Sequence, residues 1–263
     1  MINDLWYKNA VIYCLSVGTY MDSNGDGIGD FKGLMRRLDY LHGLGVTAIW
    51  LMPFQVSPHR DDGYDVSDYY GVDPRYGTIG DFVEFTHGAK QRGIRVLIDL
   101  VVNHTSDQHP WFKQARKDPD SKYRDWYVWS KKKPPRADHG MVFPGVQKST
   151  WSYDHEAKAW YFHRFYDFQP DLNTSHPEVQ AEILKIMGFW IQLAFPASAW
   201  MRCRSSSRAK DRTSASRRSS MTCSAASASF CSGGRGTASY LRKPTCCPRP
   251  TWNISARTAT ACT

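Results

Sequence analysis

The chain has 263 residues and a formal net charge of +9, but residues 1–193 hold 22 Lys and Arg against 24 Asp and Glu, whereas residues 194–263 hold 12 against one. The second part also holds six of the seven cysteines and 14 serines, with few aliphatic residues and no hydrophobic period, so we expect a disordered tail. Only Cys14 precedes this tail, no stretch approaches the length of a membrane span and no signal peptide is recognisable, which excludes a disulfide framework and favours a cytoplasmic protein without a membrane segment.

A polar, glycine-rich loop follows the first predicted strand, Ala10–Val17. In this loop, MDSNGDGIGD, oxygen-bearing side chains fall on alternate residues, and the glycines permit the tight backbone that brings them round one ion. The pattern resembles the first half of an EF-hand loop, so we expect a calcium site. The alternative is a turn rich in Asp and Asn that binds no metal. The expected ligands are the side chains of Asp22, Asn24, Asp26 and Asp30 and the carbonyl oxygen of Ile28.

Leucines at helical spacing, the last of them Leu44, predict a helix over Phe31–Leu44, and the apolar run Val46–Met52 predicts a second buried strand. The loop that follows, residues 53–77, is too long and too polar for a simple connection. Carboxylates accept hydrogen bonds from sugar hydroxyls and an aromatic face covers the apolar side of a pyranose, so the loop suits a sugar site; the alternative is a solvated acidic loop. The residues concerned are Asp61, Asp62, Tyr64, Asp65 and Asp68.

The segment Arg95–His104, RVLIDLVVNH, follows an amphipathic helix, Thr78–Arg92, and is the centre of the predicted fold. It is apolar on both faces, as expected for a parallel strand covered by helices, and ends on two polar residues, Asn103 and His104. Three strand–helix alternations predict an α/β protein with a parallel sheet or barrel. In such folds the carboxyl ends of the strands carry the chemistry, which places Asn103 and His104 in the candidate site.

Residues 105–176 break this alternation and are rich in Trp, Tyr, Lys and Asp, so we expect them to form a small inserted subdomain. The next helix is predicted over Pro177–Leu193, with Pro in its first turn and an acidic residue near its amino end. A fourth strand is expected after this helix.

The motifs NGDGIGDF, DDGYDVSDYY, DLVVNHTSDQHPWF and QPDLN, in this order and at these separations, resemble glycoside hydrolase family 13, the α-amylase family. The segments MVFPGVQKSTWSYD and YFHRFYDFQPDLN are most similar to the members that isomerise maltose to trehalose. The resemblance covers residues 1–193. It implies a (β/α)8 barrel whose first part is residues 1–104, a subdomain over 105–176 inserted after the third strand, and the third barrel helix at 177–193, acting on α-glucosides such as maltose and trehalose with retention of configuration.

The resemblance also implies roles for individual residues. Asp61 and His104 would hydrogen-bond the glucose ring at the bond that is cleaved, and Tyr64 would stack on that ring. Gln147 would reach the ring from the inserted subdomain. Asn103 and Asp171 would ligate a second calcium ion, which ties the subdomain to the barrel.

Retaining glycosidases need two carboxyl groups about 5 Å apart, a nucleophile and an acid/base. In the family these are an Asp on the fourth strand, in a motif resembling GFRMDAV, and a Glu beyond the fifth strand, and neither motif is present. Trp200 and Met201 have one codon each, TGG and ATG, so the overlapping frame reads GAT, which encodes Asp. Permitted codons for residues 195–207, preceded by the last base of codon 194, give VSGFRMDAVPFVI in that frame. We therefore expect residues from about 194 onward, including the tail 194–263, to be out-of-frame translation.

This interpretation leaves three barrel strands, with unpaired edges on the first and third, and an inactive chain. Another family member, such as an α-glucosidase or an oligo-1,6-glucosidase, is the nearest alternative. A non-catalytic protein that binds sugar and calcium is a second. A nucleic-acid arm formed by the Arg-rich tail is a third, and it is disfavoured because no aromatic or glycine repeat interleaves the arginines. We expect no nucleic-acid and no membrane partner.

Overall fold

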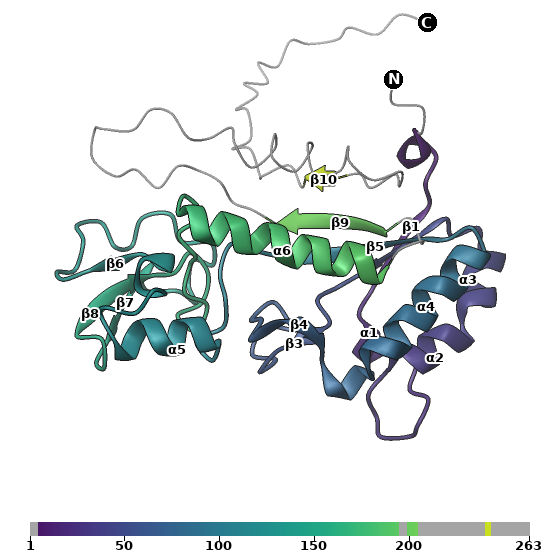
Figure 1. Cartoon of the computed structure of the whole chain (residues 1–263), viewed down its shortest axis with the longest axis horizontal. Helices are drawn as coiled ribbons and strands as arrows, with labels where there is room; N and C mark the ends of the chain where they lie inside the picture. The colour runs from purple at the N-terminus through teal and green to yellow at the C-terminus, as the bar shows by residue number, and fades with distance from the viewer. Residues whose placement is uncertain (1–4, 195–198, 205–239, 243–263) are drawn as a thin grey trace, which may run out of the picture.

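The computed structural model describes residues 5–194, 199–204 and 240–242. Its centre is a five-stranded parallel sheet in the order β1-β2-β5-β9-β10 (Figure 1). Figure 1 shows helices α2–α4 at one end of the molecule, the inserted subdomain at the other and α6 between them. The strands are β1 (Ile12–Leu15), β2 (Ala48–Leu51), β5 (Arg95–Val101), β9 (Ala199–Arg204) and β10 (Tyr240–Arg242).

Strands β2 and β5 bury apolar side chains on both faces, as the sequence predicts for a helix-covered parallel strand. Alternate residues of a strand point to opposite faces. On the helix-covered face Ile49, Val96 and Ile98 belong to the main core. On the other face a small cluster is formed by Ala48 and Leu97, with Trp6 and Trp50 packed against it.

Helix α4 (Ile79–Gln91) forms the crossover from β2 to β5 and confirms the helix predicted there. A capping box begins it: the hydroxyl of Thr78 accepts a hydrogen bond from the amide of Asp81, and the carboxylate of Asp81 accepts one from the amide of Thr78. Its apolar face packs in a cluster of fully buried aromatic side chains. The members of this cluster are Phe31, Phe54, Phe82, Phe85 and Trp190.

The single helix expected over Phe31–Leu44 is two helices, α2 (Phe31–Arg36) and α3 (Leu38–Gly43). The break is at Arg37, whose backbone dihedral angles are not helical. The backbone amide of Arg37 donates to the carbonyl oxygens of both Leu34 and Met35. The apolar stripe continues across the break, because Leu34, Leu38 and Leu41 are all fully buried. The stripe ends there, and Leu44, which was expected to extend it, is exposed.

Helix α6 (Pro177–Leu193) has the predicted bounds and joins three parts of the chain. Its Trp190 donates an indole hydrogen bond to the carbonyl of Tyr69 at 2.8 Å. The hydroxyl of Tyr69 in turn donates to the carbonyl oxygens of Val101 and His104, at 2.8 and 3.0 Å. This network fixes the carboxyl end of β5 against α6.

The remaining elements form two small antiparallel sheets and several short helices. A hairpin-like pair, β3 (Gln55–Val56) and β4 (Asp68–Val72), carries the loop after β2. The inserted subdomain holds a three-stranded sheet in the order β6-β8-β7 and the helix α5 (Pro110–Lys117). The other bounds are β6 (Trp129–Ser130), β7 (Trp151–Asp154), β8 (Ala159–Phe162), α1 (Val17–Tyr20), and the 3-10 helices η1 (Trp6–Lys8), η2 (Pro74–Tyr76) and η3 (Arg124–Trp126).

Two strands of the large sheet correct the expectations for the tail. Strand β9 pairs with β5 along six residues, from Val96 opposite Ala199 to Val101 opposite Arg204, so the third barrel strand does not end in an unpaired edge. Backbone pairing does not depend on side chains, which explains how a segment without the family's fourth-strand motif occupies that position. Disorder is therefore wrong for residues 199–204 and 240–242, and for the rest of the tail the expectation lies outside the described residues.

Strand β1 is the open edge of the sheet, as the sequence predicts. It pairs only with β2 in the described sheet, and its residues Ile12 and Tyr13 are 42% and 39% exposed.

None of the helices in the described ranges is long and apolar enough to span a membrane.

Candidate functional site

The candidate site lies at the carboxyl ends of β2 and β5, where the loop after β3 meets the end of the strand that carries His104. His104 is buried, and its Nε2 donates to the backbone carbonyl of Tyr64 at 3.0 Å. A carbonyl oxygen can only accept, so Nε2 carries the hydrogen and Nδ1 accepts from the amide of Asn103 at 3.2 Å. The imidazole also packs edge-on against the ring of Phe165, at 5.1 Å between centroids. The predicted residues His104 and Tyr64 are thus brought together.

Tyr64 is held through its side chain by a residue that the sequence analysis missed. Its hydroxyl donates to a carboxylate oxygen of Asp99 at 3.0 Å. Asp99 is buried in the middle of β5 and shares the parity of Leu97, so it faces away from the helices. An acidic residue inside an otherwise apolar strand was the available signal, because a buried carboxylate needs a partner.

Asp61 is also oriented by a residue from a distant part of the chain. The amide of Gln169 donates to the Asp61 carboxylate at 2.8 Å, and Gln169 itself is fully buried. The two residues are 108 positions apart, so no local pattern could pair them. Gln169 belongs to the QPDLN motif, and the order of motifs was therefore the only signal for it.

Gln147 is hydrogen-bonded within the inserted subdomain, and contact of its side chain with a sugar stays a prediction. Its Oε1 accepts hydrogen bonds from the amides of Val142 and Phe143, at 2.9 and 3.0 Å. Its Nε2 donates to the carbonyl oxygens of Arg164, at 3.1 Å, and of Phe165. The amide group is engaged at both ends within the subdomain, where it joins the loop at 142–147 to the segment that carries Phe165.

Asn103 and Asp171 meet where the subdomain returns to the barrel. A bridge pairs His104 with Asp171, and the carbonyl of Asn103 accepts a hydrogen bond from Leu172 at 2.9 Å. Asp171 is buried, and its Oδ1 accepts from the amide of Arg164 at 2.8 Å. The structure brings the two expected ligands of the second calcium ion to the junction between the subdomain and the barrel segment, and ion binding there stays a prediction.

The loop between α1 and α2 folds round its own acidic side chains. Asp22 accepts hydrogen bonds from the amides of Gly25 and Gly27, at 2.7 and 2.8 Å, and these bonds lower the pKa of its carboxyl group. Both glycines adopt φ near +85°, at 84° and 87°, which L-residues rarely do. The carboxylate of Asp26 accepts from Ile28 and Asn24.

Asp30 ends this loop and begins α2. Although burial raises the pKa of Asp30, hydrogen bonds from Gly33 and Ser23 outweigh it and lower that pKa overall. The donor set of this loop, three carboxylates, an amide oxygen and a carbonyl, is the hard oxygen chemistry that calcium prefers. Within the described part of the chain, no group of three or more His, Cys, Asp and Glu side chains is already gathered for a metal, so calcium stays a prediction.

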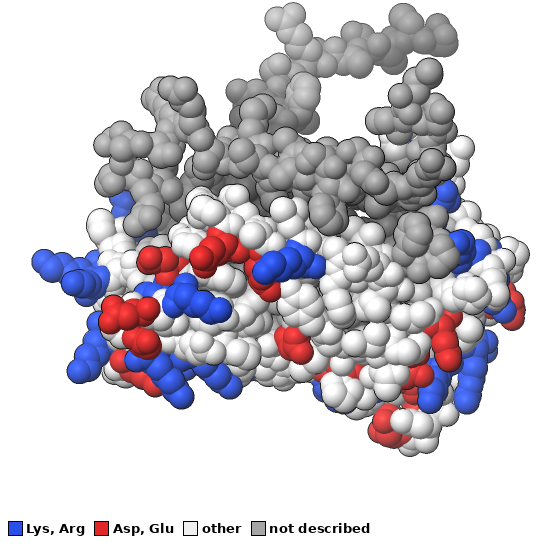
Figure 2. All heavy atoms as spheres, in the orientation of Figure 1, with Lys and Arg blue, Asp and Glu red and all other residues white. Residues whose placement is uncertain are grey.

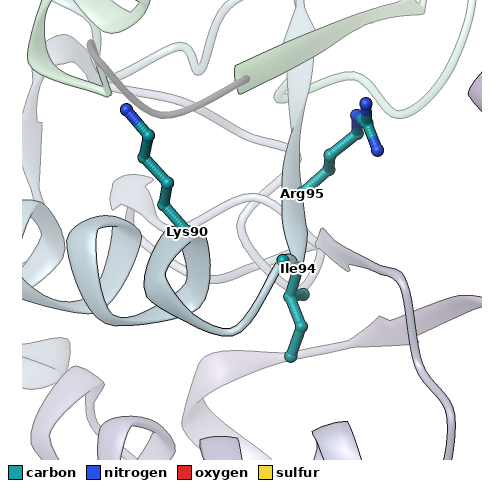
Figure 3. Close-up of a pocket in the computed structure, with 4 residues that line it drawn as sticks. Lys90, Ile94 and Arg95 are labelled. Carbon is teal, nitrogen blue, oxygen red and sulfur yellow. The ribbon is translucent and has the colours of Figure 1, made fainter.

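A cavity of about 140 Å³ lies at the opposite end of the barrel segment (Figure 3). It is lined by Lys90, Gly93, Ile94 and Arg95, at the junction of α4 and β5. Because β5 runs from Arg95 toward His104, residues 96–102 separate this cavity from the polar residues Asn103 and His104. The cavity is therefore not part of the candidate sugar site.

Comparison with known proteins agrees with the motifs and the geometry. The family model described as the alpha amylase catalytic domain matches residues 14–195. This chain belongs to the α-amylase family. Family members in solved structures carry the same barrel segment: trehalulose synthase from Pseudomonas mesoacidophila is 42% identical, with a TM-score of 0.68, over 76% of this chain and 35% of that chain. Other structures of trehalulose synthase hold glucose, sucrose or isomaltulose.

Among curated relatives in the α-amylase family, the trehalose synthase of Thermus thermophilus is 53% identical over 193 residues, which are 73% of this chain and 20% of that protein. The oligo-1,6-glucosidase of Parageobacillus thermoglucosidasius is 44% identical over 189 residues, 71% of this chain and 33% of that protein. The chain therefore spans between a fifth and a third of the length of these relatives.

Proposed function

We propose that the described part of this chain is the glucose-binding half of an enzyme that isomerises maltose to trehalose by retaining glucosyl transfer. One observation carries the proposal: His104 meets the loop that carries Asp61 and Tyr64, although it lies 40 residues beyond Tyr64 in the sequence. In that loop the side chains of Asp61 and Tyr64 are fixed by two buried residues, Gln169 and Asp99. The identity of 53% with a trehalose synthase supports the isomerase over other family activities.

The roles follow from the chemistry of these groups. The Asp61 carboxylate accepts hydrogen bonds from sugar hydroxyls, and the amide of Gln169 keeps it oriented. The ring of Tyr64 covers the apolar face of the glucose, while Asp99 fixes its hydroxyl end. His104 contributes an imidazole whose tautomer is set by the carbonyl of Tyr64. Binding groups held rigidly in this way contribute to orientation of the reacting bond.

Calcium enters the proposal as a structural ion. Asp22, Asn24, Asp26, Asp30 and the Ile28 carbonyl would hold one ion, and Asn103 and Asp171 a second. When bound, each ion would neutralise carboxylates and hold its loop in one conformation.

We also propose that the 263-residue chain has no catalytic activity. A retaining mechanism needs a nucleophilic carboxylate to form the glycosyl-enzyme intermediate, and binding residues such as His104 cannot replace it. The overlapping frame at Trp200 and Met201 encodes Asp, so a protein translated in that frame from about residue 194 would recover the nucleophile. We refer to that protein as the frame-restored protein.

Product analysis tests this function. The frame-restored protein is expected to convert maltose to trehalose, and the 263-residue chain is expected to show no turnover above a frame-restored His104→Ala control. If glucose is the sole product, the enzyme is an α-glucosidase or an oligo-1,6-glucosidase and not an isomerase. The 44% identity to an oligo-1,6-glucosidase is the observation behind this alternative. Maltose binding without turnover by the frame-restored protein would indicate a non-catalytic sugar-binding protein.

A nucleic-acid role for the described surface finds no support on the face shown in Figure 2. There Lys and Arg are interspersed with Asp and Glu at both ends of the molecule, and the middle is largely uncharged. Phosphate-binding surfaces instead gather positive charge on one face.

A further inference from the structure

The loop that carries Asp61 has an unusual backbone. His59 and Asp62 adopt φ of 58° and 46°, a left-handed conformation that is uncommon for residues other than glycine. The neighbouring Gly63 has φ of 90°, and a side chain there would approach the carbonyl oxygen of Pro53 to 2.7 Å. Such conformations persist only where surrounding contacts over-determine them, and they occur often at binding sites.

Asp65 supplies those contacts from the inside of the loop. Its side chain is fully buried and accepts three hydrogen bonds from residues of the same loop. One carboxylate oxygen accepts from the hydroxyl of Ser57 at 2.9 Å and from the amide of Asp61 at 3.2 Å. The other accepts from the amide of Arg60 at 3.0 Å. One buried carboxylate thus closes the loop on itself.

Asp61 is therefore held at two points. Its backbone amide is bound to Asp65, and its carboxylate is bound to Gln169 at 2.8 Å. The first contact sets where the main chain of Asp61 lies, and the second sets which way its carboxylate points. Hydrogen bonds to an ionised acceptor are stronger than those between neutral groups, which suits Asp65 to holding an unfavourable backbone.

We propose that Asp65 is a positioning residue for sugar binding, which acts by fixing the backbone of Arg60 and Asp61. The inference rests on the proposed function, because it takes Asp61 as a sugar ligand. Asp65 itself makes no contact with the sugar. An amide at position 65 keeps one acceptor oxygen but places an NH2 group against a donor, so Asp65→Asn breaks at least one of the three hydrogen bonds while it conserves shape.

Amide exchange in the 263-residue chain tests the structural half, with single-residue resolution from fragmentation mass spectrometry. In Asp65→Asn, exchange at the amides of Arg60 and Asp61 is expected to rise about tenfold to a hundredfold, the effect of losing hydrogen bonds to a charged group. The matched control is Asp107→Asn, because Asp107 also binds Arg60, but through its guanidinium group, at 3.2 Å and near the surface. The same exchange rates in both variants would overturn the proposal.

If Asp65→Asn does not fold, its amide exchange in β5 will be fast. A second variant then tests the proposal. Ser57→Ala removes one donor to Asp65 and leaves the carboxylate in place. It is expected to raise exchange at Arg60 and Asp61 about threefold, consistent with the loss of a single hydrogen bond. No change in Ser57→Ala, together with an unfolded Asp65→Asn, would show that Asp65 stabilises the fold and does not position Asp61.

Kinetics of the frame-restored protein on maltose test the functional half. Asp65→Asn is expected to raise KM about tenfold, because a displaced Asp61 loses contact with the bound substrate. A residue that only stabilised the fold would reduce the amount of active protein, which lowers kcat and leaves KM unchanged. An unchanged KM with an active parent protein would overturn this inference alone, whereas an inactive parent would overturn the proposed function and leave the exchange result to decide whether Asp65 fixes the loop.

Discussion

Asp26 tests whether its loop binds calcium. In the frame-restored protein, Asp26→Ala removes a carboxylate that the structure already directs into the loop, toward Ile28 and Asn24. Calcium at 100 times its dissociation constant should stabilise the parent protein by about 2.7 kcal/mol, because the ion binds only the folded state. The variant should melt at a lower temperature, and added calcium should not restore it. Asp120→Ala, at an exposed position elsewhere, is the control, and equal melting with calcium and with chelator in the parent would show that the loop is a turn without an ion.

His109 should make stability depend on pH. Burial lowers the pKa of His109 from 6.5 to about 3, and its ring packs between Trp111 and Tyr69, at 4.1 and 5.6 Å. Below pH 6.5 the unfolded chain binds a proton at this residue that the folded chain does not bind. The contribution to stability is therefore complete above about pH 6.5 and is lost as the pH falls toward 3, with a loss of about 2 kcal/mol between pH 7 and 5.

The measurement is urea unfolding of the frame-restored protein at pH 7 and pH 5. His109→Asn keeps an acceptor for the amide of Trp111, which the imidazole now caps at 3.1 Å, and removes the titrating group. This variant should lose about 2 kcal/mol less than its parent between the two pH values. His155→Asn, which removes an exposed imidazole, should behave like the parent, and an identical pH dependence in all three proteins would contradict the prediction.

At the scale of single residues, the sequence predicted the candidate site residues that the structure brings together, but not the partners that hold them. Asn103 and His104 were predicted from the polar end of an apolar strand, and Asp61 and Tyr64 from an acidic loop with an aromatic ring. Asp99 was missed because β5 was interpreted as apolar on both faces. The orientation of Gln147 could not be predicted, because it depends on a turn at 142–147 and on carbonyl groups near position 165 that come together only in the folded subdomain.

At the scale of elements, α6 is the helix whose packing connects the sheet to the site. Trp190 is fully buried, and its indole is the donor to the carbonyl of Tyr69. Trp190→Phe should lower the free energy of unfolding of the frame-restored protein by about 1–3 kcal/mol, since a buried carbonyl loses its donor. Trp160→Phe, at a half-buried position in the subdomain, should cost less in urea unfolding, and equal losses would show that the indole hydrogen bond contributes nothing specific.

The elements themselves followed from hydrophobic periodicity to different degrees. The bounds of α6 were predicted because Pro177 begins it and its apolar residues recur without interruption. The break at Arg37 was not predicted, because the leucines on either side keep helical spacing and remain buried. A fourth strand was expected after α6, but its formation by residues of the tail was not predicted, since the backbone pairing of β9 with β5 requires no hydrophobic pattern. Pairing of neighbouring strands is a tertiary property that the segment alone does not reveal.

At the scale of the whole molecule, the open edge at β1 should make the 263-residue chain associate. Val11, at 53% exposed, adjoins Ile12 and Tyr13 on this edge, and an unpaired apolar strand edge promotes pairing with other chains. Phe189 and Trp190, at the end of α6, do not add to this surface, because Trp190 is fully buried and Phe189 packs against Tyr70. Size-exclusion chromatography with light scattering should show species larger than a monomer, and a monodisperse monomer with slow amide exchange in Val96–Val102 would contradict the prediction.

The register of the sheet gives β1 one more property. Cys14 lies opposite Trp50, on the face away from the helices, and its side chain is exposed. In a closed barrel that face becomes the packed interior, which excludes water and reagents. The rate at which a thiol reagent modifies Cys14 should therefore report closure: fast in a chain that carries only part of the barrel, and slow in one that completes it. Cys14 is the single cysteine before residue 194, so its rate of modification can be used to follow assembly of the barrel without any substitution in that part of the chain.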